Sequence, residues 1–182
     1  EIIRENESGY YNFKEGNIAF IIMNTEISVN EGSPQYQFVE QKLKEAKDNP
    51  NVKWIIVSYH RPSVTARDDN HEGTQTNIYK YYHKLFDTYK VDLILAGHNH
   101  NFHRTYPVNH LIDVENPTKV DNSNGPNIDL GARVFVTIGT GGTDLRNDRD
   151  TEYIAYRNNS DYGILLIDLL ENGTKLKCTF KS

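Results

Sequence analysis

Three histidines in this chain follow apolar stretches at a spacing suited to binding metal ions. His60 closes the stretch VSYH, and His98 and His100 lie two residues apart in the stretch GHNH. Imidazole is the commonest metal ligand among protein side chains. The glycine before His98 frees the backbone for a sharp turn, so two imidazoles can address one small volume. We therefore predict that His60, His98 and His100 are metal ligands.

A purely structural role is the alternative for each of these histidines. A single histidine at the end of a strand is usually just hydrogen-bonded, and this interpretation applies best to His60 taken alone. It is weaker for His98 and His100, because the turn allowed by Gly97 lets both imidazoles address one small volume. All three also follow predicted strands, so the same edge of a sheet would bring them together.

The elements that would position the histidines are read from hydrophobic periodicity. Compact apolar runs predict buried strands, and the carboxyl ends of such strands are where open α/β sheets bind ligands. Apolar residues at helical spacing predict two helices between them. The strands are expected at 18–23, 54–58, 91–96 and 133–138, the helices at 34–47 and 77–89, and long surface loops at 113–129 and 143–160.

The motifs, taken in order, resemble those of a known family. VSYH followed by Arg61-Pro62, and then GHNH followed by Phe102 and Arg104, look like the last two metal motifs of the calcineurin-like metallophosphoesterases, and within them of the purple acid phosphatases. Segment 10–26 is similar to the strand pair that follows the family's Asn-His motif. The late strand and glycine-rich turn of the family are matched by 133–142, and its closing hairpin by 163–180.

The family's earlier metal motifs have no match at the expected positions. Gly16-Asn17 is followed by Ile18 rather than His, and the chain contains no Gly-Asp pair. Residues 69–71 spell Asp-x-His, but they lie in a polar segment with no strand before it. The resemblance therefore implies an α/β fold that is half of a four-layer α/β/β/α sandwich with mixed sheets. Residues 1–182 are expected to be the C-terminal portion of one catalytic domain.

The resemblance also implies the chemistry. A complete domain would hydrolyse phosphoesters with two metal ions, of which His60 and His98 would bind one and His100 the other. Iron, zinc and manganese all suit such a ligand set, and the metal identity is left open. Without the missing carboxylates, this chain alone is expected to bind at most one divalent ion and to be inactive.

A fourth histidine is a candidate catalytic residue. His71 stands where plant-type purple acid phosphatases carry a histidine that protonates the leaving alcohol, and an ordinary solvated loop histidine is the alternative. His103 replaces the family's usual Glu, which alters the charge next to the metal ligands. Arg104 fits the family pattern and is expected to form an ion pair. His83 and His110 are interpreted as structural or exposed.

Composition restricts the possible partners. A net charge of −5 argues against nucleic acid as the main ligand, because a phosphate backbone needs a basic face. No apolar run is long enough to span a membrane. The single cysteine, Cys178, excludes an internal disulfide. The family resemblance favours a secreted or extracytoplasmic location without fixing one.

The predicted strands are apolar on both faces, yet two helices and one hairpin cannot cover them completely. We therefore expect an open apolar surface that associates with the missing N-terminal half of the domain or with a second chain.

Two other functions are possible for this chain. One is a non-catalytic fragment or degenerate module that binds a partner chain, and the other is a hydrolase with one metal on three histidines. A phosphoester is the expected substrate, and its class stays open.

Overall fold

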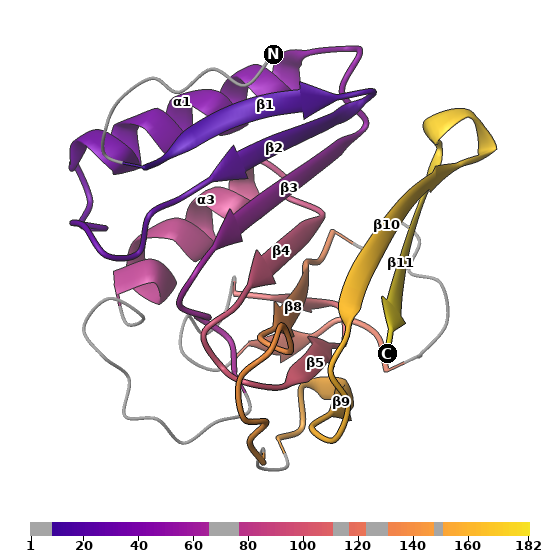
Figure 1. Cartoon of the computed structure of the whole chain (residues 1–182). Helices are drawn as coiled ribbons and strands as arrows, with labels where there is room; N and C mark the ends of the chain where they lie inside the picture. The colour runs from indigo at the N-terminus through magenta and orange to yellow at the C-terminus, as the bar shows by residue number, and fades with distance from the viewer. Residues whose placement is uncertain (1–8, 66–76, 111–116, 123–130, 148–150) are drawn as a thin grey trace.

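The computed structural model describes residues 9–65, 77–110, 117–122, 131–147 and 151–182. These residues form an α/β structure with one large mixed sheet, helices on one of its faces and a β-hairpin on the other (Figure 1). The helical elements are α1 (Pro34–Asp48), the π-helix η1 (Ile78–Tyr82), α3 (His83–Thr88) and the 3₁₀ turn η2 (Glu171–Gly173). The strands are β1 (Tyr11–Glu15), β2 (Ile18–Ile22), β3 (Trp54–Tyr59), β4 (Leu93–Ala96), β5 (Phe102–Thr105), β6 (Val108–Asn109), β7 (Thr118–Lys119), β8 (Val134–Ile138), β9 (Ile154–Asn158), β10 (Ile164–Leu170) and β11 (Lys175–Lys181).

The large sheet has seven strands in the order β1-β2-β3-β4-β8-β5-β9. Strands β2, β3, β4 and β8 run parallel to one another. Strand β1 is antiparallel to β2, β5 is antiparallel to β8, and β9 is antiparallel to β5. In the β3–β4 pair Tyr59 stands opposite Ala96, so the two strands end at the same level. The carboxyl ends of four strands therefore meet at one edge of the sheet.

The helices bury one face of this sheet. Helix α1 begins at Pro34, and the hydroxyl of Ser33 caps it by accepting a hydrogen bond of 3.2 Å from the amide of Tyr36. Its Val39 and Leu43 are fully buried, as are Ile78 and Phe86 from η1 and α3. Together with the sheet they form the larger of two hydrophobic clusters. Burial of these side chains against the sheet is the main stabilising interaction of the fold.

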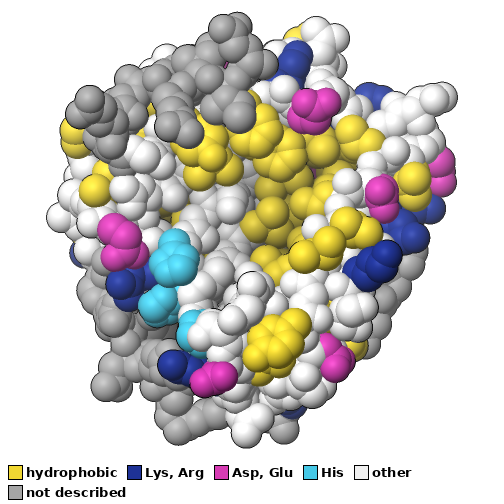
Figure 2. Space-filling view, in the orientation of Figure 1, with side chains coloured by type: hydrophobic (Ala, Val, Ile, Leu, Met, Phe, Trp, Pro, Cys, Tyr) yellow, Lys and Arg dark blue, Asp and Glu magenta, His cyan; other side chains and the backbone are white. Residues whose placement is uncertain are grey.

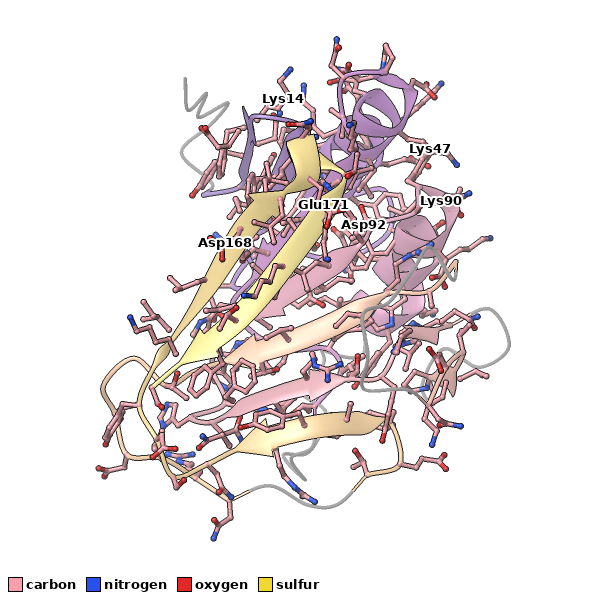
Figure 3. All side chains as sticks on the ribbon, turned by 90° about the vertical axis from the view of Figure 1, so that its right-hand side faces the viewer. Lys14, Lys47, Lys90, Asp92, Asp168 and Glu171 are labelled. Carbon is pink, nitrogen blue, oxygen red and sulfur yellow. The ribbon has the colours of Figure 1, made fainter. Side chains whose placement is uncertain are left out.

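The hairpin β10–β11 covers part of the opposite face. Leu165, Ile167 and Phe180 on its inner side contact a smaller cluster that contains Ile56 and Val136 of the sheet. Its tip is fixed at Gly173, whose carbonyl accepts hydrogen bonds from Asn17 Nδ2 at 3.0 Å and from Trp54 Nε1 at 2.9 Å. Figure 3 shows the hairpin lying across the sheet, with Glu171 near its tip.

The base of the hairpin is fixed as well. The hydroxyl of Thr140, just after β8, donates to the carbonyl of Gly163 at 2.8 Å, and the Gly163 amide lies 3.4 Å from the carbonyl of Thr140. The hairpin is thus tied to the sheet at both of its ends. Within the described residues, no helix has both the length and the apolar character needed to cross a membrane.

The α/β class and most predicted elements are confirmed, and three details differ. The segment predicted as a surface loop over 113–129 contains the short strand β7, which pairs with β6. The segment predicted as one helix over 77–89 is a π-helix followed by a short α-helix. The prediction of a continuous surface loop over 143–160 is wrong, because β9 forms within it and pairs with β5. Its Tyr156 and Arg157 are exposed, so this edge strand lacks the apolar signal of a buried one.

A series of buried side-chain hydrogen bonds connects β3 to the helices. The hydroxyl of Tyr59 lies 2.6 Å from Ser63 Oγ, which in turn lies 2.7 Å from Nε2 of His83. His83 is 1% exposed, and its ring centroid is 3.9 Å from that of His110. Burial, reinforced by the charge of His110, lowers the pKa of His83 well below 6.5. His83 is therefore structural and neutral.

This histidine should make the fold sensitive to acid. In the unfolded chain His83 titrates near 6.5, so the unfolded state takes up a proton first and stability is lost as pH falls below that value. We expect the free energy of unfolding to fall by about 1.4 kcal/mol per pH unit for this group. Urea unfolding at pH 7, 6 and 5 measures it. His83→Gln should flatten the pH dependence, and His60→Gln, which changes an exposed histidine, should leave it steep.

Candidate metal centre

The structure brings two of the predicted ligands together. His60 directly follows β3, and His98 lies two residues after β4. Nε2 of His60 and Nδ1 of His98 are 3.3 Å apart, and the rings meet edge to face with centroids 5.1 Å apart. The parallel pairing of β3 with β4 is what places the two strand ends side by side.

A tight turn holds His98 and His100 in place. His98 has a φ of 63°, an unusual backbone conformation for a residue other than glycine. Short-range hydrogen bonds close the turn: the Asn99 amide donates to the Gly97 carbonyl at 2.7 Å, and the Asn101 amide donates to the Asn99 carbonyl at 2.8 Å. The buried Asn99 side chain also donates to the hydroxyl of Thr65. The strained φ at His98 is thus fixed from several directions.

His100 faces the same cavity from a different side. The carbonyl of Asp144 lies 3.2 Å from its Nδ1, and the carbonyl of His100 accepts a hydrogen bond of 2.9 Å from the amide of Arg146. An open cavity of about 470 Å³ is lined by the three histidines together with Gly97, Ile138, Gly139, Gly141, Gly142 and Thr143. Figure 2 shows the histidines as a row on one face of the molecule, next to an extensive apolar surface.

The His60–His98 pair fits a metal ion by its donor chemistry and spacing. Two nitrogen ligands of a tetrahedral zinc ion, each 2.0–2.1 Å from the metal, lie roughly 3.3–3.4 Å apart. The observed separation of 3.3 Å is the same. In the part of the chain that the structure describes, no three His, Cys, Asp or Glu side chains gather closely enough to form a metal site. The pair therefore offers two ligands to one ion, and His100 offers a third donor elsewhere in the cavity.

An ion pair lies next to His60 and joins Arg61, the following residue, to Glu26 in the segment after β2. Nε and Nη2 of Arg61 donate to the two carboxylate oxygens of Glu26 at 2.8 and 3.1 Å. The Arg61 hydrogen bonds lower the pKa of Glu26 below its usual value, despite the opposing effect of desolvation. Sequence reasoning did not single out this pair. The available signal was an arginine directly after His60 and an acidic residue shortly after the strand at 18–22.

The remaining candidates lie in different surroundings. His71 is outside the described residues, so its role stays a prediction. His103 is completely buried in β5. Arg104 is half-buried, donates to the carbonyl of Thr105 at 3.2 Å, and has its pKa lowered chiefly by desolvation. His110, like His83, is buried in the core beneath the helices. The expected ion pair of Arg104 stays a prediction.

Comparison with known proteins identifies the family. The family model for calcineurin-like phosphoesterases matches residues 4–102, more than half of the 182 residues and the part that contains all three cavity histidines. The chain belongs to the calcineurin-like phosphoesterase family.

Several of the similar proteins are named purple acid phosphatases. The chain is 28% identical over 166 residues to Fe(3+)-Zn(2+) purple acid phosphatase 12 of Arabidopsis thaliana, covering 87% of this chain and 34% of the relative. It is 27% identical over 173 residues to the probable inactive purple acid phosphatase 1 of the same plant, covering 92% of this chain and 27% of the relative. The structure of purple acid phosphatase PPD1 from yellow lupin superposes with a TM-score of 0.73 at 26% identity, covering 90% of this chain and 29% of the other.

The two Arabidopsis proteins are much longer than this chain, which covers 34% of one and 27% of the other. The purple acid phosphatase resemblance and the fold class expected from the sequence are both confirmed.

A close backbone contact makes Gly139 a test of the site. A Cβ atom at Gly139 would overlap the carbonyl oxygen of Asn99 in the turn between His98 and His100. Gly139→Ala should displace this turn and lower the free energy of unfolding by about 1–3 kcal/mol. Gly141→Ala is the matched control, because nothing lies within 4 Å of its Cβ position. Chemical denaturation of both variants measures the difference, and equal stabilities would contradict the prediction.

Proposed function

We propose that the protein to which this chain belongs hydrolyses phosphoesters at a two-metal centre. The observation that supports this best is the convergence of His60 Nε2 and His98 Nδ1 at the spacing of two ligands on one ion. Family membership supports the coarser assignment, a metal-dependent phosphatase-type hydrolase. The two-metal centre and the individual ligands are the finer part of the proposal.

His60 and His98 would hold one ion and His100 the other. Bound ions would supply polarisation of the phosphoryl oxygens and a water of lowered pKa. The histidines themselves provide neutral nitrogen donors, and the backbone around them sets the direction of each ring. The Asp144 carbonyl beside Nδ1 of His100 favours a proton on that nitrogen, which leaves Nε2 as the donor to a metal. Iron, zinc and manganese are all compatible with these ligands, and one relative is named as an Fe(3+)-Zn(2+) enzyme.

The substrate would enter through the open cavity beside the histidines. Gly139, Gly141 and Gly142 line this cavity and carry no side chain to obstruct a phosphate group. His71 is proposed to protonate the leaving alcohol, because a neutral alcohol leaves more easily than an alkoxide.

The open apolar surface is proposed to contact the rest of the catalytic domain. Phe20, Trp54, Leu95 and Ile138 are only partly buried on the face that the hairpin shares, and Figure 2 shows the apolar surface continuing beside the histidines. In the described residues β10 and β11 pair only with each other, and a two-stranded sheet is marginally stable by itself. Further strands beside this hairpin would cover the apolar surface and could bring the missing carboxylate ligands. A second chain is the alternative occupant.

A non-catalytic module is the competing function. It is supported by the similarity to a relative named as a probable inactive purple acid phosphatase, and by the lack of a clustered carboxylate among the described residues. The two functions differ in metal dependence, which can be measured directly.

The proposed function predicts metal-dependent hydrolysis that requires the histidine pair. The complete protein should hydrolyse an aryl phosphate, lose activity with a chelator, and regain it with added metal. His98→Ala should bind less metal by elemental analysis and lose at least 10²-fold in kcat/KM, because a direct ligand is removed. The isolated 182-residue chain should show no turnover. A complete protein whose hydrolysis is unaffected by chelation or by His98→Ala would contradict the assignment.

The general-acid role of His71 predicts a dependence on the leaving group. His71→Ala in the complete protein should retain its metals and slow alkyl phosphates by roughly 10²- to 10⁴-fold, but aryl phosphates much less, since these leave without protonation. Rates on one alkyl and one aryl ester, together with metal content, measure this. Equal losses on both esters would rule out the role.

A further inference from the structure

Hydrogen bonds tie the end of β2 to the end of β3 on both sides of His60. The amide of Met23 donates to the carbonyl of Ser58 at 2.8 Å, and the amide of Arg61 donates to the hydroxyl of Thr25 at 3.2 Å. From the other neighbouring strand, the amide of Gly97 donates to the carbonyl of His60 at 3.0 Å. The backbone of His60 is therefore held by both β2 and β4.

The side chain of Arg61 extends this connection to Glu26. Its Nε and Nη2 bind separate carboxylate oxygens at 2.8 and 3.1 Å, which is a bidentate arrangement. Two parallel N–H···O bonds fix the relative orientation of both groups, unlike a single contact. Because Arg61 directly follows His60, fixing its side chain also restricts the backbone angles that set the direction of the imidazole.

The exposure of the ion pair indicates whether it stabilises the whole fold or only the residues next to it. The side chains of Arg61 and Glu26 are 21% and 54% exposed. Ion pairs this close to solvent add little to the stability of a fold. The effect of the pair should therefore be concentrated on what it touches, which is the end of β3 and His60.

We propose that the Glu26–Arg61 ion pair is a positioning clamp for the imidazole of His60, which keeps its Nε2 directed toward Nδ1 of His98 and so raises the affinity of this nitrogen pair for a divalent cation. The inference rests on the metal site proposed above. Glu26 and Arg61 act through His60, as residues that orient a ligand. Removing a partner that hydrogen-bonds a ligand directly typically weakens metal binding 10- to 100-fold, and this indirect clamp is expected to act at the lower end of that range.

The first measurement is a Co²⁺ titration of the purified protein, followed by the absorbance of the bound ion. Glu26→Gln should weaken binding about 10-fold, and Arg61→Met should do the same. The exchanged pair, Glu26→Arg with Arg61→Glu, should recover part of the affinity. The matched control is Glu171→Gln, which breaks the 3.2 Å ion pair of Glu171 with Lys175 at the far end of the hairpin (Figure 3). The control should bind Co²⁺ like the wild type, and all variants should unfold at nearly the same temperature.

The second measurement uses the metal-free protein, so that it does not depend on a bound ion. In NMR spectra of isotopically labelled histidine, Glu26→Gln should shift or broaden the ring signals of His60, and Glu171→Gln should not. A wild type that binds Co²⁺ no better than His98→Ala would count against the metal site itself. Unchanged His60 ring signals in Glu26→Gln would overturn the clamp, as would unchanged Co²⁺ affinity in a protein that binds the ion.

Discussion

The parallel register of β3 and β4 is the constraint on which the candidate site depends. Tyr59 stands opposite Ala96, so His60 and Gly97 leave the sheet at the same level and His98 follows one residue later. A slip of one residue would turn every side chain of one strand to the other face of the sheet. The buried residues of both strands prevent this, because Val57 and Ile94 must face the helices while Ile56 and Leu93 face the hairpin. Core packing thus determines where the imidazole nitrogens meet.

The two faces of the sheet differ in how completely they are covered. Helices α1, η1 and α3 bury one face in a large hydrophobic cluster that contains Tyr59. Tyr59 begins the hydrogen-bonded series that continues through Ser63 to His83, whose ring contacts Phe86 of the same cluster. The other face has only the hairpin, and several of its aromatic and aliphatic side chains stay partly exposed. The candidate site lies at the edge shared by both faces. Its backbone therefore rests on a well-packed layer, while its approach borders a surface suited to association.

Much of the fold could be predicted from the sequence because its strands are apolar and its helices amphipathic. Strands β2, β3, β4 and β8 give compact apolar runs and helix α1 gives a helical periodicity, whereas the closing hairpin was expected from the family resemblance. All were found near the expected residues. Strand β9 gave no such apolar run, since it is an edge strand with polar and exposed positions. The π-helix was missed because its Ile78, Tyr79 and Tyr82 satisfy an ordinary helical pattern equally well.

The site could be predicted only in part. Residue type and strand ends were enough to propose His60, His98 and His100, and the family resemblance grouped His60 with His98. The sequence could not give the 3.3 Å separation of their ring nitrogens. Glu26 and Arg61 are 35 residues apart in the sequence, so their residue types alone do not show that they form a pair. Pairings of this kind depend on sheet order, which a single sequence specifies only indirectly.

The attachment of the hairpin at both ends has a mechanical consequence. Its tip is held at Gly173 by Asn17 and Trp54, near the amino ends of β2 and β3, and its base is held at Gly163 by Thr140, within the turn that lines the histidine cavity. The hairpin therefore connects opposite edges of the sheet. Local unfolding of the hairpin would break the hydrogen bonds at both of its ends together. The glycine-rich turn that lines the cavity and the hairpin should therefore unfold and refold locally as one cooperative unit.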